Sequence, residues 1–175
     1  LHVRSRRQRQ MCIRDRASLD PASAQQTLAL LGAQQVPQSN ILYVNGDMIN
    51  RYLQDGSNAS TQVLSSAYIQ QMPEGYGVQV QIVTPQNITV VRPLTYQNAA
   101  ITAGARNVNI RIATVAPVTG EGALTGVYAL LEQQGQAVNT HDVQVAQSEI
   151  NLVNQIEQEE TVSNEVATVS YTHLT

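Results

Sequence analysis

The sequence predicts a single mixed α/β (α+β) domain over residues 17–168, in which a mixed sheet of about five short strands is covered by about five helices. Three observations support this. The segment has the length of one domain. Stretches with strand periodicity are interleaved with stretches of helical periodicity. The expected order, α-β-α-β-β-β-α-β-α-α, is not a regular βα alternation, which disfavours a doubly wound sheet.

The first half of this domain begins with a helix and then brings most of the strands. Asp20 and Pro21 are residues that open a helix, and Gly32 can end it with a left-handed cap. We expect a hairpin between two of the strands because turn residues, Pro73-Glu74-Gly75, lie between them. The elements predicted here are a helix from Asp20 to Leu31, a strand at 41–44, a helix at 48–54, the hairpin strands at 62–71 and 78–82, and a short strand at 87–91.

The second half is richer in helix. The first three expected elements are followed by a glycine or proline, the residues that most often interrupt regular structure. The predicted elements are a helix at 96–103, a strand at 108–115, a helix at 123–134 and a last helix that begins at Thr140 or Asp142. No internal repeat and no interior linker is visible in the sequence.

Both ends of the chain match translated sequencing-library adapter. Met11 to Asp15 can be read back as ATG TGT ATA AGA GAC, part of a tagmentation transposase end sequence, and residues 6–10 fit the adapter before it. Residues 169–175 can be encoded by the reverse complement of the same element. The alternative is a basic arm that binds nucleic acid. Two matches in the correct orientations favour adapter, so we expect 1–16 and 169–175 to be non-native and 17–168 to be a gene fragment lacking both native termini.

The charge of residues 17–168 argues against nucleic acid as a partner. The segment holds four arginines and no lysine against twelve carboxylates, a formal net charge of −8. Proteins that bind phosphate backbones need a basic patch, which this segment cannot easily build. No apolar run is long enough to span a bilayer. Cys12 is adapter, and His141 is the only histidine of the segment, so we expect no disulfide, metal or cofactor.

A glycine-containing loop, residues 117–126, is the most suggestive motif. It follows a strand and opens a helix, where backbone N–H groups could hold an anion. Without lysine it is no Walker loop, and its glycine spacing is not that of a dinucleotide site. The simpler interpretation is a tight strand-to-helix turn, with Gly126 allowing close packing. The candidate ligand-binding residues are Pro117, Thr119, Gly120, Glu121, Gly122 and Thr125.

No catalytic set emerges from the sequence, and we assign no catalytic residue. Hydroxyls need a positioned base to act as nucleophiles, and paired carboxylates for glycan chemistry cannot be tested by spacing alone. Solvated, capping or turn positions explain these residues more simply. The residues considered are Asp47, Ser65, Ser66, Glu74, Thr119, Glu121, His141 and Asp142.

Several short stretches, in a fixed order across most of 24–165, carry a family resemblance. They are Ile41-Leu42-Tyr43-Val44, Arg51-Tyr52-Leu53, Ser65-Ser66-Ala67-Tyr68, Gly75-Tyr76-Gly77-Val78-Gln79-Val80, Asn87-Ile88-Thr89, Thr102-Ala103-Gly104 and Ala116 through Gly126. Together they resemble the exported Gram-positive family called domain of unknown function 1002. The absence of lysine and the many glutamines depart from that family's habit. The resemblance implies an export signal upstream and a place in the cell envelope or outside the cell, but no activity.

We therefore expect an exported envelope or extracellular protein that serves as a non-catalytic binding or structural module. Its expected partner is a cell-wall polymer or an envelope protein. Two alternatives remain open at this point: a hydrolase acting on wall glycan or peptide through Glu121 with Thr119 or His141, and a small-ligand-binding domain that uses the 117–126 loop.

Overall fold

Helices cover both faces of one mixed sheet. The computed structural model describes residues 9–14, 20–136, 138, 139, 141, 143–145 and 148. The strands are β1 (Arg9–Arg14), β2 (Ile41–Val44), β3 (Ser65–Gln71), β4 (Val78–Ile82) and β5 (Val108–Thr114). The α-helices are α1 (Pro21–Leu31), α2 (Gly46–Leu53), α3 (Pro93–Thr102) and α4 (Glu121–Gln133), with 3-10 turns η1 (Gln38–Asn40) and η2 (Pro85–Asn87). The predicted mixed α/β domain is thereby confirmed.

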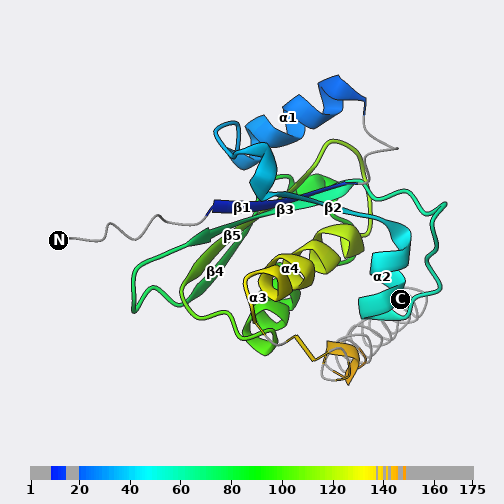
Figure 1. The fold of residues 1–175 in the computed structure, drawn as a ribbon. Helices are drawn as coiled ribbons and strands as arrows, with labels where there is room; N and C mark the ends of the chain where they lie inside the picture. Colours follow the sequence, from blue (N-terminus) through cyan, green and yellow to red (C-terminus); the bar gives the residue numbers. More distant parts are fainter. Residues whose placement is uncertain are drawn as a thin grey trace, which may run out of the picture.

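The sheet has the order β2-β1-β3-β5-β4. Its outer pairs, β1 with β2 and β4 with β5, are parallel, whereas β3 is antiparallel to both β1 and β5. Helix α1 lies on one face of the sheet and α3 and α4 lie on the other (Figure 1). Because β1 and β2 are parallel, the chain must cross over between them, and α1 makes that crossover.

Local capping explains the ends of α1 and the start of α2. Asp20 accepts a hydrogen bond from the backbone N–H of Ser23 at 3.0 Å, and Gly32 ends α1 with φ at 63°. Asn45 accepts from the N–H of Met48 at 3.0 Å, so that α2 begins at Gly46, two residues before the predicted start. Side chains that accept from free first-turn N–H groups stabilise a helix start.

The predicted hairpin between 62–71 and 78–82 is wrong. β5 lies between β3 and β4 and pairs with both of them. The residue pattern explains this order, because Ile110 and Ile112 of β5 are fully buried, whereas Gln79 and Gln81 of β4 are exposed. A strand with an exposed amide face suits the edge of the sheet, and the turn at 73–75 only changes the direction of the chain.

The predicted strand at 87–91 is also wrong. Residues 85–87 form η2, and only an isolated bridge, Ile88 with Val118, follows it. The predicted helix at 96–103 begins earlier, at Pro93, because proline suits the first helical position, where its missing N–H costs nothing. The predicted last helix falls mostly outside the described residues. β1 is not among the predicted strands, because it lies within residues 1–16, which the codon match predicts to be adapter.

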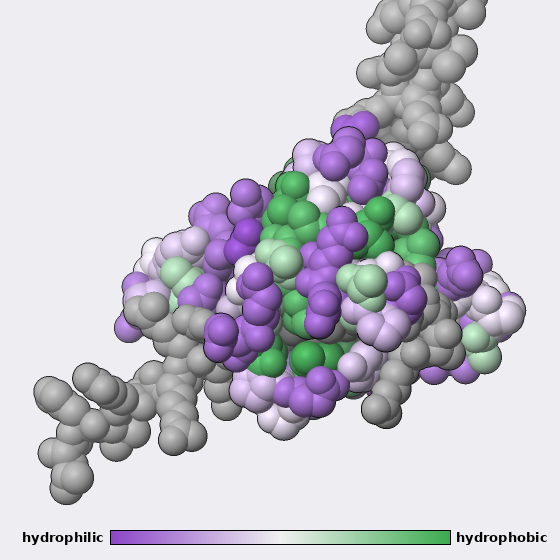
Figure 2. Space-filling model, turned by 90° about the horizontal axis from the view of Figure 1, so that it is seen from above, coloured by the Kyte–Doolittle hydropathy of each residue, from purple (hydrophilic) through white to green (hydrophobic). Residues whose placement is uncertain are grey.

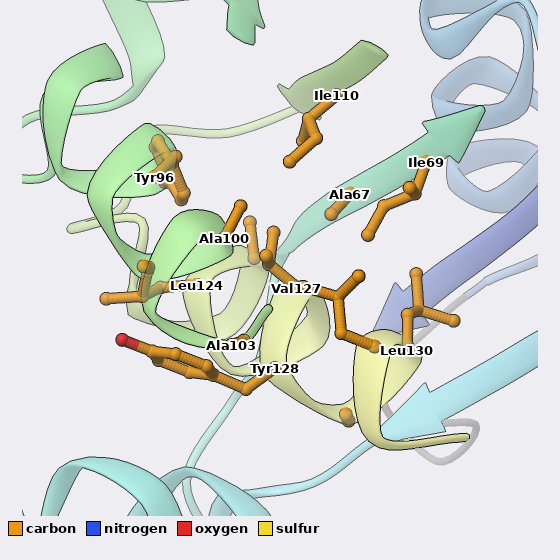
Figure 3. Packing of buried hydrophobic residues seen from close by; sticks show 14 of the residues in the cluster. Ala67, Ile69, Tyr96, Ala100, Ala103, Ile110, Leu124, Val127, Tyr128 and Leu130 are labelled. Carbon is orange, nitrogen blue, oxygen red and sulfur yellow. The ribbon is translucent and has the colours of Figure 1, made fainter. Parts of the chain in front are cut away.

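Two hydrophobic clusters hold the layers together. The larger one lies between the sheet and helices α3 and α4, and Figure 3 shows Val127 and Leu130 of α4 facing Ala67 and Ile69 of β3. The smaller one lies under α1 around Leu31 and Tyr68. With no phenylalanine or tryptophan in the chain, tyrosines provide the largest buried side chains. The face that carries α1 shows hydrophobic patches separated by hydrophilic residues (Figure 2).

Candidate functional site

The 117–120 segment joins β5 to α4 and is fixed by a neighbouring segment of the chain. Val118 bridges Ile88 in parallel fashion, and its N–H donates to the carbonyl of Asn87 at 2.9 Å. The carbonyl of Thr119 accepts from the N–H of Val91 at 2.9 Å. Two segments that are remote in the sequence, 87–91 and 117–120, therefore lie side by side with their backbones hydrogen-bonded.

Gly120 is required by its conformation and by its neighbour Tyr96. Its φ is 105°, a region that other residues rarely adopt, and a Cβ built there would lie 2.5 Å from the Tyr96 hydroxyl oxygen. That hydroxyl donates to the Gly120 carbonyl at 2.9 Å, and Tyr96 is fully buried. Burial, with a smaller contribution from the Glu121 charge, raises the pKa of Tyr96 above its ordinary value, so the phenol remains a donor.

The N-terminus of α4 packs directly on β3. The N–H of Ala123 donates to Ser65 Oγ at 2.8 Å, and the N–H of Leu124 donates to the Gly120 carbonyl at 3.1 Å. A Cβ at Gly122 would lie 2.4 Å from Val63 Cγ1. The N–H groups of Ala123 and Leu124 are thus used inside the fold and are not available to hold an anion, as expected for a tight strand-to-helix turn.

The six candidate ligand-binding residues divide into two groups. Gly120, Gly122 and Thr125 are buried, and the hydroxyl of Thr125 has no hydrogen-bond partner among the described residues. The other three, Pro117, Thr119 and Glu121, are exposed or half-buried. Thr119 Oγ1 donates to Glu121 Oε2 at 3.1 Å. A ligand approaching from solvent would therefore meet the second group.

The structure adds two apolar residues that sequence reasoning missed. Val90 is 53% exposed, and its N–H lies 3.3 Å from the Thr119 carbonyl oxygen. Leu94, in the first turn of α3, is 63% exposed. We call the surface formed by Thr89, Val90, Thr119 and Glu121 the loop patch. The sequence did not identify Val90 as a surface residue, because the pattern at 87–91 predicts a strand there.

The other polar candidates do not converge on the loop patch. Ser65 and Ser66 are buried, and Asp47 and Glu74 are exposed on α2 and on a turn. The backbone N–H of His141 donates to Asn139 Oδ1 at 3.1 Å. Among the described candidate acids and nucleophiles, a hydrogen bond joins the side chains of Thr119 and Glu121. Within the described part of the chain, no group of three or more His, Cys, Asp or Glu residues could hold a metal ion.

Among the described helices, none has both the length and the apolar character to cross a membrane. No curated protein and no solved structure is significantly similar to the chain. The family model described as "Protein of unknown function (DUF1002)" matches residues 17–172. This match begins where the predicted N-terminal adapter ends and runs four residues beyond the predicted native end at 168. Since it covers most of the sequence, the chain belongs to the family of proteins of unknown function DUF1002.

Proposed function

We propose that the protein is an exported, non-catalytic binding module of the cell envelope or the extracellular space, and that the loop patch contacts a cell-wall polymer or an envelope protein. The observation that supports this most is the exposure of Val90, which is hydrogen-bonded through its backbone to Thr119, the partner of Glu121. Exposed apolar side chains with a few convergent polar groups are typical of recognition surfaces.

The backbone beneath the loop patch is constrained, which favours binding. The carbonyl of Thr119 accepts hydrogen bonds from the backbone N–H groups of Val90 and Val91. The buried hydroxyl of Tyr96 donates to the carbonyl of Gly120. A preorganised surface loses less conformational entropy when a partner binds than a flexible loop does. The patch also contains one carboxylate, Glu121, which can accept hydrogen bonds from hydroxyl or amide groups of a polymer.

The proposal can be tested by co-sedimentation of the full chain with purified wall sacculi and with intact cells. Val90→Ser removes the exposed apolar side chain of the loop patch and is expected to weaken binding by roughly tenfold, the equivalent of about 1.4 kcal/mol of lost contact. Ile101→Ser is the matched control, because Ile101 is also a β-branched apolar residue, is 52% exposed and is not part of the loop patch. The proposal fails if the chain binds neither material, or if the two variants bind equally well.

A hydrolase is the second candidate, because the Thr119 hydroxyl is hydrogen-bonded to the Glu121 carboxylate. A hydroxyl next to a carboxylate base is the minimum arrangement for an activated nucleophile. Release of soluble fragments from sacculi, measured for the full chain and for Glu121→Gln, separates the two functions. Release that disappears in the variant favours hydrolysis, whereas binding without release favours the non-catalytic module.

A further inference from the structure

The middle of the sheet needs a strand between β2 and β3. β1 is parallel to β2 from Met11 with Ile41 to Arg14 with Val44, and antiparallel to β3 from Arg9 with Gln70 to Cys12 with Ala67. Both neighbouring strands have buried residues, since Val44 and Ala67 are fully buried. Buried backbone N–H and C=O groups require partners, so a sheet without this strand would have two unpaired edges inside the protein.

The register assigns each position of β1 to one of the two hydrophobic clusters. Positions 10, 12 and 14 pair with Ile69, Ala67 and Val44, which belong to the larger cluster. Positions 11 and 13 pair with Tyr68 and Tyr43, which belong to the smaller cluster or pack against it. Paired positions share one face of a sheet. A strand with both faces covered is typically apolar at nearly every position.

The sequence at β1 satisfies only half of this requirement. Met11 and Ile13 are apolar, but Gln10 and Arg14 occupy positions that pair with fully buried residues of the larger cluster. Glutamine and arginine are rarely buried without partners, because desolvation of their polar groups is costly. Taken with the adapter codons and the start of the family match at residue 17, this mismatch indicates that RQMCIR was not selected for the place it occupies.

We propose that the native polypeptide supplies its own strand to this place, from the segment directly before Ala17, and that this native strand is apolar on both faces. Strand pairing uses the main chain and makes few demands on side chains, so an adapter-encoded segment can occupy the same position. Residues 15–19 separate β1 from Asp20, a normal length for a strand-to-helix connection. The native strand should therefore end within a few residues of Ala17. This inference does not depend on the proposed function.

Thermal unfolding of the full 175-residue chain tests the mismatch. The double variant Gln10→Val, Arg14→Val changes the two positions that pair with the larger cluster. The matched control Arg6→Val, Gln8→Val makes the same two types of change at positions that precede Arg9, the first residue of β1. We expect the first variant to raise Tm by roughly 4 °C or more relative to the control. If the first variant has a Tm no higher than that of its control, the inference is overturned, because Gln10 and Arg14 would then not destabilise the fold at their positions.

Discussion

Removal of one hydroxyl group, in Tyr96→Phe, tests how the candidate site is anchored to the core. The hydroxyl donates to the Gly120 carbonyl at 2.9 Å and is buried. That carbonyl also accepts from the N–H of Leu124 at 3.1 Å, so the variant does not leave it without any partner. The phenylalanine ring keeps the packing of the tyrosine ring. The loss should therefore be that of one net hydrogen bond, about 1 kcal/mol, and not the larger penalty of an orphaned buried group.

Urea denaturation followed by circular dichroism measures this loss. We expect the midpoint to fall with an unchanged slope, and a fall in Tm of roughly 2–4 °C for a chain of this size. Tyr76→Phe is the control, because Tyr76 is 38% exposed and its change should lie within about 0.5 kcal/mol. Equal stability of Tyr96→Phe and the unmodified chain would refute the idea that this hydrogen bond fastens the loop to the core.

Three further predictions concern the start of α4 and the hydrophobic core around that helix. Gly122→Ala should destabilise the protein by about 1–3 kcal/mol in urea denaturation, because its Cβ would lie 2.4 Å from Val63 Cγ1; an equally stable variant would contradict the close packing. Ser65→Ala should cost about 1–2 kcal/mol in the same assay, because the N–H of Ala123 loses its buried acceptor, and an unchanged midpoint would argue against that role. Burial raises the pKa of Tyr128 to about 12, above an unfolded value of about 10, so its stabilising contribution is complete below about pH 10 and is lost as the pH rises through the folded pKa. Tyr128→Phe should therefore flatten the decline of Tm between about pH 10 and 12, and an identical decline in both proteins would contradict the raised pKa.

Local patterns predicted most helices and strands because capping residues and periodicity act over a few residues. Asp20 caps the start of α1 and Gly32 caps its end, as predicted. The alternation of Val108, Ile110 and Ile112 predicted β5. Sheet order was not predictable in the same way. Whether β4 pairs with β3 or with β5 depends on which strand has to be buried, a property of the whole domain.

The candidate site could be predicted only in part, because local sequence patterns do not show contacts between distant segments. Residues 117–120 follow β5 and lead into a helix as the sequence indicated, but α4 begins at Glu121, two residues before its predicted start at 123, so residues 121–126 are helical. Sequence could not show that Ser65 would accept from the first turn of α4, or that Val90 would lie beside Thr119, because these contacts join residues far apart in the chain. The exposure of Leu94 depends on which face of α3 meets the sheet, and that helix begins three residues before its predicted start.

The most direct test is to read the native gene at and before the codon for Ala17, in DNA prepared without transposon tagging. We expect an export signal and, between it and Ala17, an apolar strand segment that ends within a few residues of Ala17. We also expect the sequence SRRQRQMCIRDR to be absent. A native gene that encodes SRRQRQMCIRDR in frame before Ala17 would contradict the strand inference, and a start codon without an export signal would contradict the envelope assignment.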